Sequence, residues 1–223
     1  MDVPDQSKKY LEEFLPFVRK VLPYEPVILG GWAVYAFTKK QKSVDVDVLL
    51  KDKKDIELLK PFFTERKFKL EEDNEGNVTF ELETQKHEYK GITLESIIFD
   101  LMLVTEPNVL HSNKNISVQW ELCYEFNEKA KLNGTEILAP TKELLVILKT
   151  KALLDREYDK YKFKNFTNKQ WLRRKEFKIE KDKQDIKDLF EVGVNQKQIE
   201  LILSKTNFQK HFYETIKQLL PTQ

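Results

Sequence analysis

The stretch that most constrains the fold runs from Leu29 to Leu50 and reads LGGWAVYAFTKKQKSVDVDVLL. Gly30-Gly31 follows an apolar run, a helix-like segment comes next, and a valine-rich run then carries Asp45 and Asp47. Successive side chains of a strand alternate faces, so these two aspartates would share one face, ~6.6 Å apart, with the valines on the other. Two carboxylates side by side repel each other unless a cation lies between them. The pattern predicts a strand that holds Mg²⁺ or Mn²⁺.

The two glycines predict a phosphate site beside this metal site. A Gly-Gly turn between a strand and a helix lets the backbone approach a ligand closely, because no Cβ intervenes. The free N–H groups at the start of the helix, with its positive dipole end, suit a phosphate. A metal beside a phosphate indicates nucleotide chemistry, so we expect an NTP as substrate. A valine at Gly30 or Gly31 would then weaken NTP binding with little loss of stability.

The order of these residues resembles the signature of the DNA polymerase β-type nucleotidyltransferase superfamily. That signature has two glycines and then, about a dozen residues later, a small hydroxyl residue, one apolar residue and DxD, here Gly30-Gly31, Ser43, Asp45 and Asp47. The resemblance implies a small mixed-sheet nucleotidyltransferase core and two-metal transfer of NMP from an NTP, with release of pyrophosphate. It also implies that Ser43 contacts a phosphate; a plain strand serine is the alternative.

A third carboxylate is expected on a neighbouring strand, because two carboxylates rarely give two metal ions enough ligands. The run ITLESIIFDLMLV, residues 92–104, predicts a central strand in which Asp100 stands among apolar residues. A lone carboxylate in such a run is costly unless it is paired or bound to a metal. Asp100 is therefore the candidate third ligand, with Glu95 as the fallback and an aspartate held by backbone donors or a lysine as the alternative. By the resemblance, Asp100 would also be the general base.

The order of predicted elements indicates an α+β fold with a catalytic domain over 1–140 and an all-helical domain over 141–223. Helices are expected at 8–22, 31–38, 53–66, 141–157, 182–191, 196–204 and 208–220. Strands are expected at 27–29, 44–50, 68–70, 78–82 and 92–104, with a turn at 73–76. Pro61 would kink or split its helix, and Asn133-Gly134 predicts a hairpin.

The helical part carries a second resemblance. GTEILAPTKELLVILKTKALLDR followed by KDKQDIKDLF resembles the C-terminal pattern of stand-alone bacterial and archaeal nucleotidyltransferases, which include toxin-like members of abortive-infection and toxin–antitoxin systems. The resemblance implies that Lys149 pairs with the triphosphate, that Asp182 or Asp185 orients it, and that an antitoxin is a partner. The alternative is a solvated Lys149 and an Asp182 that caps a helix. We expect an exposed Lys149 whose loss leaves the fold intact.

Composition narrows the class of protein further. The net charge of +1 gives no overall attraction to nucleic acid, and Cys123, the only cysteine, excludes an intrachain disulfide. The three histidines show no metal spacing, so zinc is not expected. No apolar stretch approaches the ~20 residues that span a bilayer, and the charged amino terminus lacks a signal-peptide region, so we expect a cytoplasmic protein with no membrane partner.

Two functions remain open: an active nucleotidyltransferase, or a catalytically silent module of the same fold that acts as a toxin–antitoxin partner or nucleotide sensor. The acceptor of an active enzyme would be a hydroxyl or phosphate of an RNA such as tRNA, a protein or a small molecule, and the sequence does not choose among them. Residues 158–183 mix aromatic and basic side chains. That composition is compatible with RNA contact, although coverage of a core edge is the favoured interpretation.

Overall fold

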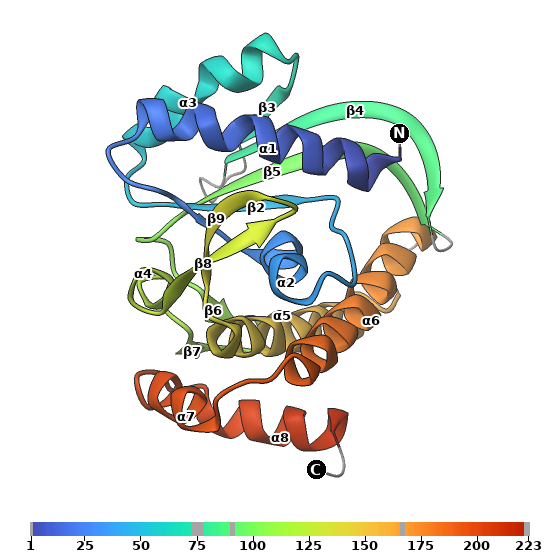
Figure 1. Cartoon of the computed structure of the whole chain (residues 1–223). Helices are drawn as coiled ribbons and strands as arrows, with labels where there is room; N and C mark the ends of the chain where they lie inside the picture. The colour runs from blue at the N-terminus through green and yellow to red at the C-terminus, as the bar shows by residue number, and fades with distance from the viewer. Residues whose placement is uncertain (1, 73–77, 90–91, 166–167, 221–223) are drawn as a thin grey trace.

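The computed structural model describes residues 2–72, 78–89, 92–165 and 168–220. Figure 1 shows a curved sheet with α1 and α3 on one side and α2, α5 and α6 on the other, and with α7 and α8 beyond α5. In these ranges the helices are α1 (Val3–Val21), α2 (Gly30–Thr38), α3 (Lys54–Glu65), α4 (Leu122–Glu125), α5 (Lys142–Lys162), α6 (Lys169–Glu191), α7 (Gln196–Ser204) and α8 (Gln209–Leu219). The strands are β1 (Val27–Ile28), β2 (Val46–Leu50), β3 (Lys69–Glu72), β4 (Val78–Tyr89), β5 (Ile92–Leu103), β6 (Val109–Leu110), β7 (Asn113–Ser117), β8 (Asn127–Leu132) and β9 (Thr135–Pro140).

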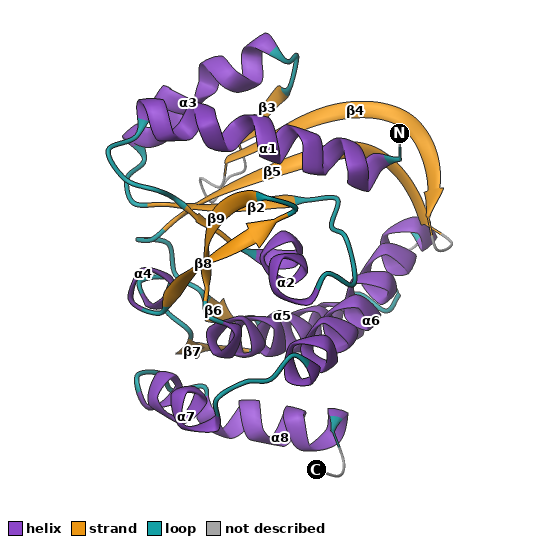
Figure 2. Cartoon of the chain, in the orientation of Figure 1, coloured by secondary structure: helices purple, strands orange, loops and turns teal. Residues whose placement is uncertain are grey.

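The main sheet is mixed and has the strand order β3-β4-β5-β2-β1-β9-β8. β2 lies in its centre, antiparallel to β1 and parallel to β5. The central position follows from the sequence, because Val46, Val48, Leu49 and Leu50 are all buried. The register of β2 on β5 places Asp47 directly beside Asp100. This fold confirms the predicted α+β class with a mixed sheet and a helical C-terminal region, as Figure 2 makes plain.

Several predicted boundaries were wrong for identifiable reasons. β2 begins at Val46, so Asp45 precedes the strand instead of lying in it. α3 is not split at Pro61 and continues to Glu65. The predicted turn at 73–76 lies outside the described residues. The largest difference is α6, which begins at Lys169 and not near 182, with the Asn168 side chain accepting a hydrogen bond from the Trp171 N–H as its N-cap.

One hydrophobic core connects the sheet to both layers of helices. Its aromatic centre lies between α1, α3 and β5, where Phe14 packs edge-on against Phe62 and Phe99, with centroids 5.2 and 5.4 Å away. The same core includes Leu144 and Leu145 of α5 and Ile186 of α6. The boundary at residue 140 therefore stays a prediction. No helix in the described ranges is long and apolar enough to cross a membrane.

Candidate active site

A cavity of about 240 Å³ lies between the central strands, α5 and α6. All seven site residues predicted from the sequence line this one cavity: Gly30, Gly31, Ser43, Asp45, Asp47, Asp100 and Lys149. The two expected halves of the site thus meet, with the glycines and carboxylates on the sheet side and the lysine on the helical side.

The three carboxylates come from the loop before β2 and from the two adjacent strands. Asp47 and Asp100 are register partners on β2 and β5, and neighbouring strands lie ~4.8 Å apart. Burial and then the neighbouring carboxylates raise the pKa of Asp47, and the same causes raise the pKa of Asp100 to about 7. Thr79 Oγ1 donates a hydrogen bond of 2.9 Å to Asp100 Oδ1. Asp47 has no side-chain hydrogen bond or ion pair with any described residue.

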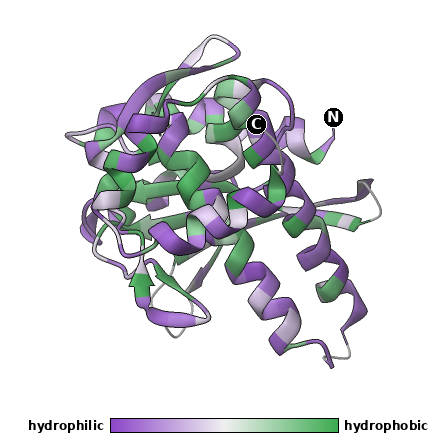
Figure 3. Ribbon diagram, turned by 90° about the horizontal axis from the view of Figure 1, so that it is seen from below, coloured by the Kyte–Doolittle hydropathy of each residue, from purple (hydrophilic) through white to green (hydrophobic). Residues whose placement is uncertain are grey.

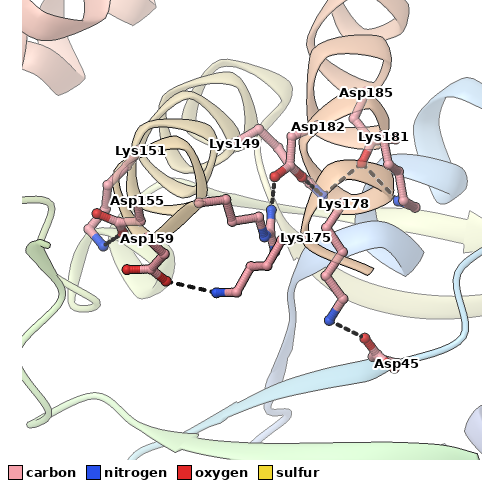
Figure 4. Close-up of polar contacts among 11 residues, drawn as sticks. Asp45, Lys149, Lys151, Asp155, Asp159, Lys175, Lys178, Lys181, Asp182 and Asp185 are labelled. Atoms are coloured by element: carbon pink, nitrogen blue, oxygen red, sulfur yellow. Dashed lines mark hydrogen bonds and ion pairs between the residues drawn. The ribbon is translucent and has the colours of Figure 1, made fainter. Parts of the chain in front are cut away.

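Asp45 is compensated by a lysine of α6. Lys178 Nζ lies 2.9 Å from Asp45 Oδ2, a contact visible in Figure 4. Burial acts to raise the pKa of Asp45, but the positive charges of Lys178, Lys181 and Arg156 outweigh it, and the pKa is lowered. The site therefore holds one ionised carboxylate beside two whose charge has no bonded counterion among the described residues.

The two glycines are required by this chain's own side chains. Gly30 has φ +61°, and a Cβ there would lie 1.8 Å from Asp47 Oδ2. A Cβ on Gly31 would lie 2.5 Å from Ser43 Oγ and 2.8 Å from Lys181 Nζ. The expectation that valine at these positions leaves stability intact is therefore wrong, since the added atoms would displace Asp47 or Ser43 before any ligand binds.

Lys149 is buried, contrary to the expectation of an exposed side chain, with only 8% of its surface accessible. Its Nζ lies 3.0 Å from Asp182 Oδ1 and 2.7 Å from Asp185 Oδ2, both on α6. Asp182 lies well inside α6, so the alternative that it caps a helix is wrong. Lys149 is thus held at the cavity wall by the two acids implied by the sequence resemblance.

The sequence interpretation missed three further cations of the cavity: Arg156, Lys178 and Lys181. Arg156 follows Lys149 by seven residues, or about two helical turns, and contacts Asp182. Lys181 Nζ lies 2.9 Å from Asp185 Oδ2, and burial followed by the charge of Lys149 lowers its pKa to about 8. The spacing of Lys178, Lys181, Asp182 and Asp185 on one helical face was the available signal. This spacing was not recognised because the helix was expected to begin at residue 182.

The three acids fit a hard divalent cation, because all their donor atoms are carboxylate oxygens. Two of the acids, Asp47 and Asp100, also lack a bonded counterion among the described residues. The described residues contain no group of three or more His, Cys, Asp and Glu side chains already arranged around a metal position. Asp45 is bound to Lys178 instead. A metal ion that binds Asp45 Oδ2 would therefore displace Lys178.

Comparison with known proteins shows the fold. No protein-family model and no curated protein matches the chain. A solved structure of the antibiotic-resistance factor ANT(2'')-Ia matches with a TM-score of 0.52 and 13% identity, covering 96% of both chains. An antigenic nucleotidyltransferase-like protein from Paracoccidioides brasiliensis matches with a TM-score of 0.49 and 14% identity, covering 97% of this chain and 93% of that one. The chain has a nucleotidyltransferase-like fold.

Proposed function

We propose that this chain is a metal-dependent nucleotidyltransferase that moves an NMP unit from an NTP to a hydroxyl or phosphate acceptor. The observation that carries the proposal is the composition of one cavity. Asp45, Asp47 and Asp100 face Lys149, Arg156, Lys178 and Lys181 beside the Gly30-Gly31 turn. Metal-binding acids opposite phosphate-binding cations are the two parts that transfer from a triphosphate needs, because catalysis rests on positioning and on charge stabilisation.

Each part of the cavity has a role in this proposal. Asp45 and Asp47 would hold Mg²⁺ or Mn²⁺ with the β- and γ-phosphates, and all three acids would hold a second ion. Bound there, the metal lowers the pKa of the acceptor hydroxyl and neutralises charge on the phosphates. Lys178 would exchange Asp45 for a phosphate oxygen. The N–H groups that begin α2 at Gly30 would contact phosphate, since Leu29 caps that helix without a side-chain hydrogen bond.

Asp100 would accept the acceptor's proton. The oxygen so released forms a bond to the α-phosphorus, and the bond between that phosphorus and the pyrophosphate oxygen breaks, so that pyrophosphate leaves with the electron pair. Thr79, bonded to Asp100 Oδ1, orients the base.

The test is transfer of label from four α-³²P-NTPs to total RNA, protein or small-molecule acceptors, with Mg²⁺ or Mn²⁺. Asp45→Asn/Asp47→Asn should lower transfer at least ~100-fold, or about 2.7 kcal/mol. The control is Glu83→Gln, an exposed carboxylate of β4 that lies outside the cavity. NTP binding without transfer under all conditions would refute the proposal in favour of the silent binding module. The toxin-like subtype, an antitoxin partner and a cytoplasmic location stay predictions from the sequence.

A further inference from the structure

The positive charge of this chain is concentrated beside the cavity. The segment Tyr158–Lys178, formed by the end of α5 and the start of α6, contains eight Lys and Arg against two Asp and Glu, in a chain with a net charge of +1. Within the described residues, four of these cations have no ion-pair partner: Lys162, Lys164, Lys169 and Arg173. These four cations attract a polyanion even though the whole chain is nearly neutral.

Two aromatic rings of this segment are exposed, whereas Tyr158, Trp171 and Phe177 are half-buried. Tyr161 is 69% exposed and Phe163 is 40% exposed. None of the segment's described aromatic residues belongs to the hydrophobic core or to the apolar residues packed against it. In Figure 3 the end of α5 and the start of α6 extend away from the rest of the molecule. For Tyr161 and Phe163, the favoured interpretation as core cover is therefore wrong.

Three cavities that share lining residues lie between the start of α6 and the active site. A cavity of about 530 Å³ has three cations, Lys86, Lys169 and Arg173, and two carboxylates, Glu88 and Glu95, in its lining. A second cavity of about 130 Å³ shares Ile92 and Glu95 with it. The second cavity shares Ser43, Asp45, Lys178 and Lys181 with the catalytic cavity. Along α6 the distance from Lys169 to Lys178 is nine residues, ~13.5 Å at 1.5 Å per residue. That length is enough for contacts to more than one backbone phosphate of a strand.

We infer that the acceptor is one end of a single-stranded polynucleotide, which lies along these cavities between α6 and β5. The inference rests on the proposed function. Lys169 and Arg173 would bind backbone phosphates, and Tyr161 and Phe163 would stack on bases farther from the end. A small-molecule acceptor would need neither the charge nor the exposed rings. A duplex would present its bases already stacked and so would gain nothing from those rings.

Binding of labelled oligonucleotides, followed by fluorescence anisotropy without NTP or metal, tests the surface independently of transfer. The probes are a 12-nucleotide RNA, the DNA of the same sequence, the RNA duplex and an abasic oligonucleotide of equal length. The single-stranded RNA or DNA should bind at least tenfold more tightly than the duplex and the abasic strand. Equal binding of the abasic strand would overturn the inference and indicate a polyanion surface.

Two double variants separate charge from stacking. Lys169→Ala/Arg173→Ala should weaken binding at least tenfold and reduce the log–log salt slope by about 1.4, or ~0.7 per lost phosphate contact. Tyr161→Ala/Phe163→Ala should weaken single-strand binding fivefold or more with the salt slope unchanged. The matched control is Lys197→Ala/Lys217→Ala, which removes two exposed lysines of α7 and α8.

The outcomes distinguish this inference from the proposed function. Unchanged binding in Lys169→Ala/Arg173→Ala, or an equal loss in the control, would overturn the inference. Normal transfer to an acceptor without bases would also overturn the inference, but the proposed nucleotidyltransferase activity would still stand. Binding that depends on Lys169 and Arg173, with no transfer from any NTP, would instead refute the proposed function.

Discussion

Gly30→Ala tests whether the turn before α2 is shaped by Asp47. Gly30 has φ +61°, and its Cβ would lie 1.8 Å from Asp47 Oδ2 and 2.8 Å from Asp47 Cγ. The chain offers a matched control in Gly193, which has φ +87° and where an added Cβ would meet no atom of the described residues within 4 Å. Both substitutions strain the backbone, and only Gly30→Ala adds a collision.

The two costs differ in size. A non-glycine residue in the left-handed region costs ~1–2 kcal/mol, and this applies to both glycines. Forcing an extra methyl group into a packed site costs a further ~1–3 kcal/mol at Gly30. We therefore expect Gly30→Ala to lower the free energy of unfolding by about 2–5 kcal/mol and Gly193→Ala by only ~1–2 kcal/mol. For a chain of this size each kcal/mol lowers Tm by roughly 2–4 °C.

Urea denaturation followed by circular dichroism, in EDTA, measures both variants. Asp47→Ala removes the colliding oxygen and Cγ, leaving Asp47 Cβ at an ordinary 3.4 Å from the new methyl group. Gly30→Ala/Asp47→Ala should therefore recover at least ~1 kcal/mol relative to the sum of the single variants. Equal destabilisation of Gly30→Ala and Gly193→Ala, or additivity in the double variant, would refute this account of the turn.

Three further predictions concern charge. Lys149→Ala should lower the free energy of unfolding by about 1.5–3 kcal/mol, because two buried aspartates of α6 lose their shared lysine and keep one cation each, Arg156 and Lys181; a loss under ~1 kcal/mol in urea denaturation would contradict it. In EDTA, Asp100→Asn should stabilise the protein at pH 8 by less than ~4 kcal/mol and have no effect near pH 3. The reason is that the protein loses stability as the pH rises from about 4 through 7, because the pKa of Asp100 is raised to about 7 in the folded state. A stabilisation by Asp100→Asn that does not grow with pH would contradict this prediction. Lys178→Gln should strengthen Mn²⁺ binding about threefold or more in calorimetry without nucleotide, because it frees Asp45, whereas Lys183→Gln, a partly exposed lysine on the same helix, should not change it.

The sheet side of the site was predictable because its pattern is local. Gly30-Gly31, Asp45 and Asp47 lie within 18 residues, and the alternation of β5 alone marked Asp100 as a carboxylate among apolar residues. Even so, the sequence could not show that Asp47 is the residue that forbids a Cβ at Gly30. That contact depends on how β2 and the start of α2 meet in space.

The helical side was less predictable because its residues act through tertiary contacts. From the sequence of its own helix alone, Lys149 is predicted to be solvated. Only the packing of α5 against α6 places it beside two carboxylates. The segment before residue 182 has few apolar residues, so helical periodicity did not mark it, although its Lys, Arg, Glu and Gln residues are good helix formers. Missing the first 13 residues of α6 also concealed Lys178 as the partner of Asp45.

α6 is the element that joins these observations. Lys178 bonds to Asp45 in the loop before β2, and Asp185 bonds to both Lys181 and Lys149. The residues of α6 before Lys178 line the cavity next to the active site. Without a divalent cation, α6 supplies the positive charge that Asp45 requires, while Asp47 and Asp100 have no such partner in the part of the chain that the structure describes. A metal ion that compensated all three acids would free the Lys178 ammonium, and the negative groups then available to it are phosphates of a nucleotide. Metal and nucleotide should therefore bind this cavity with positive coupling, each raising the affinity of the other by the same factor.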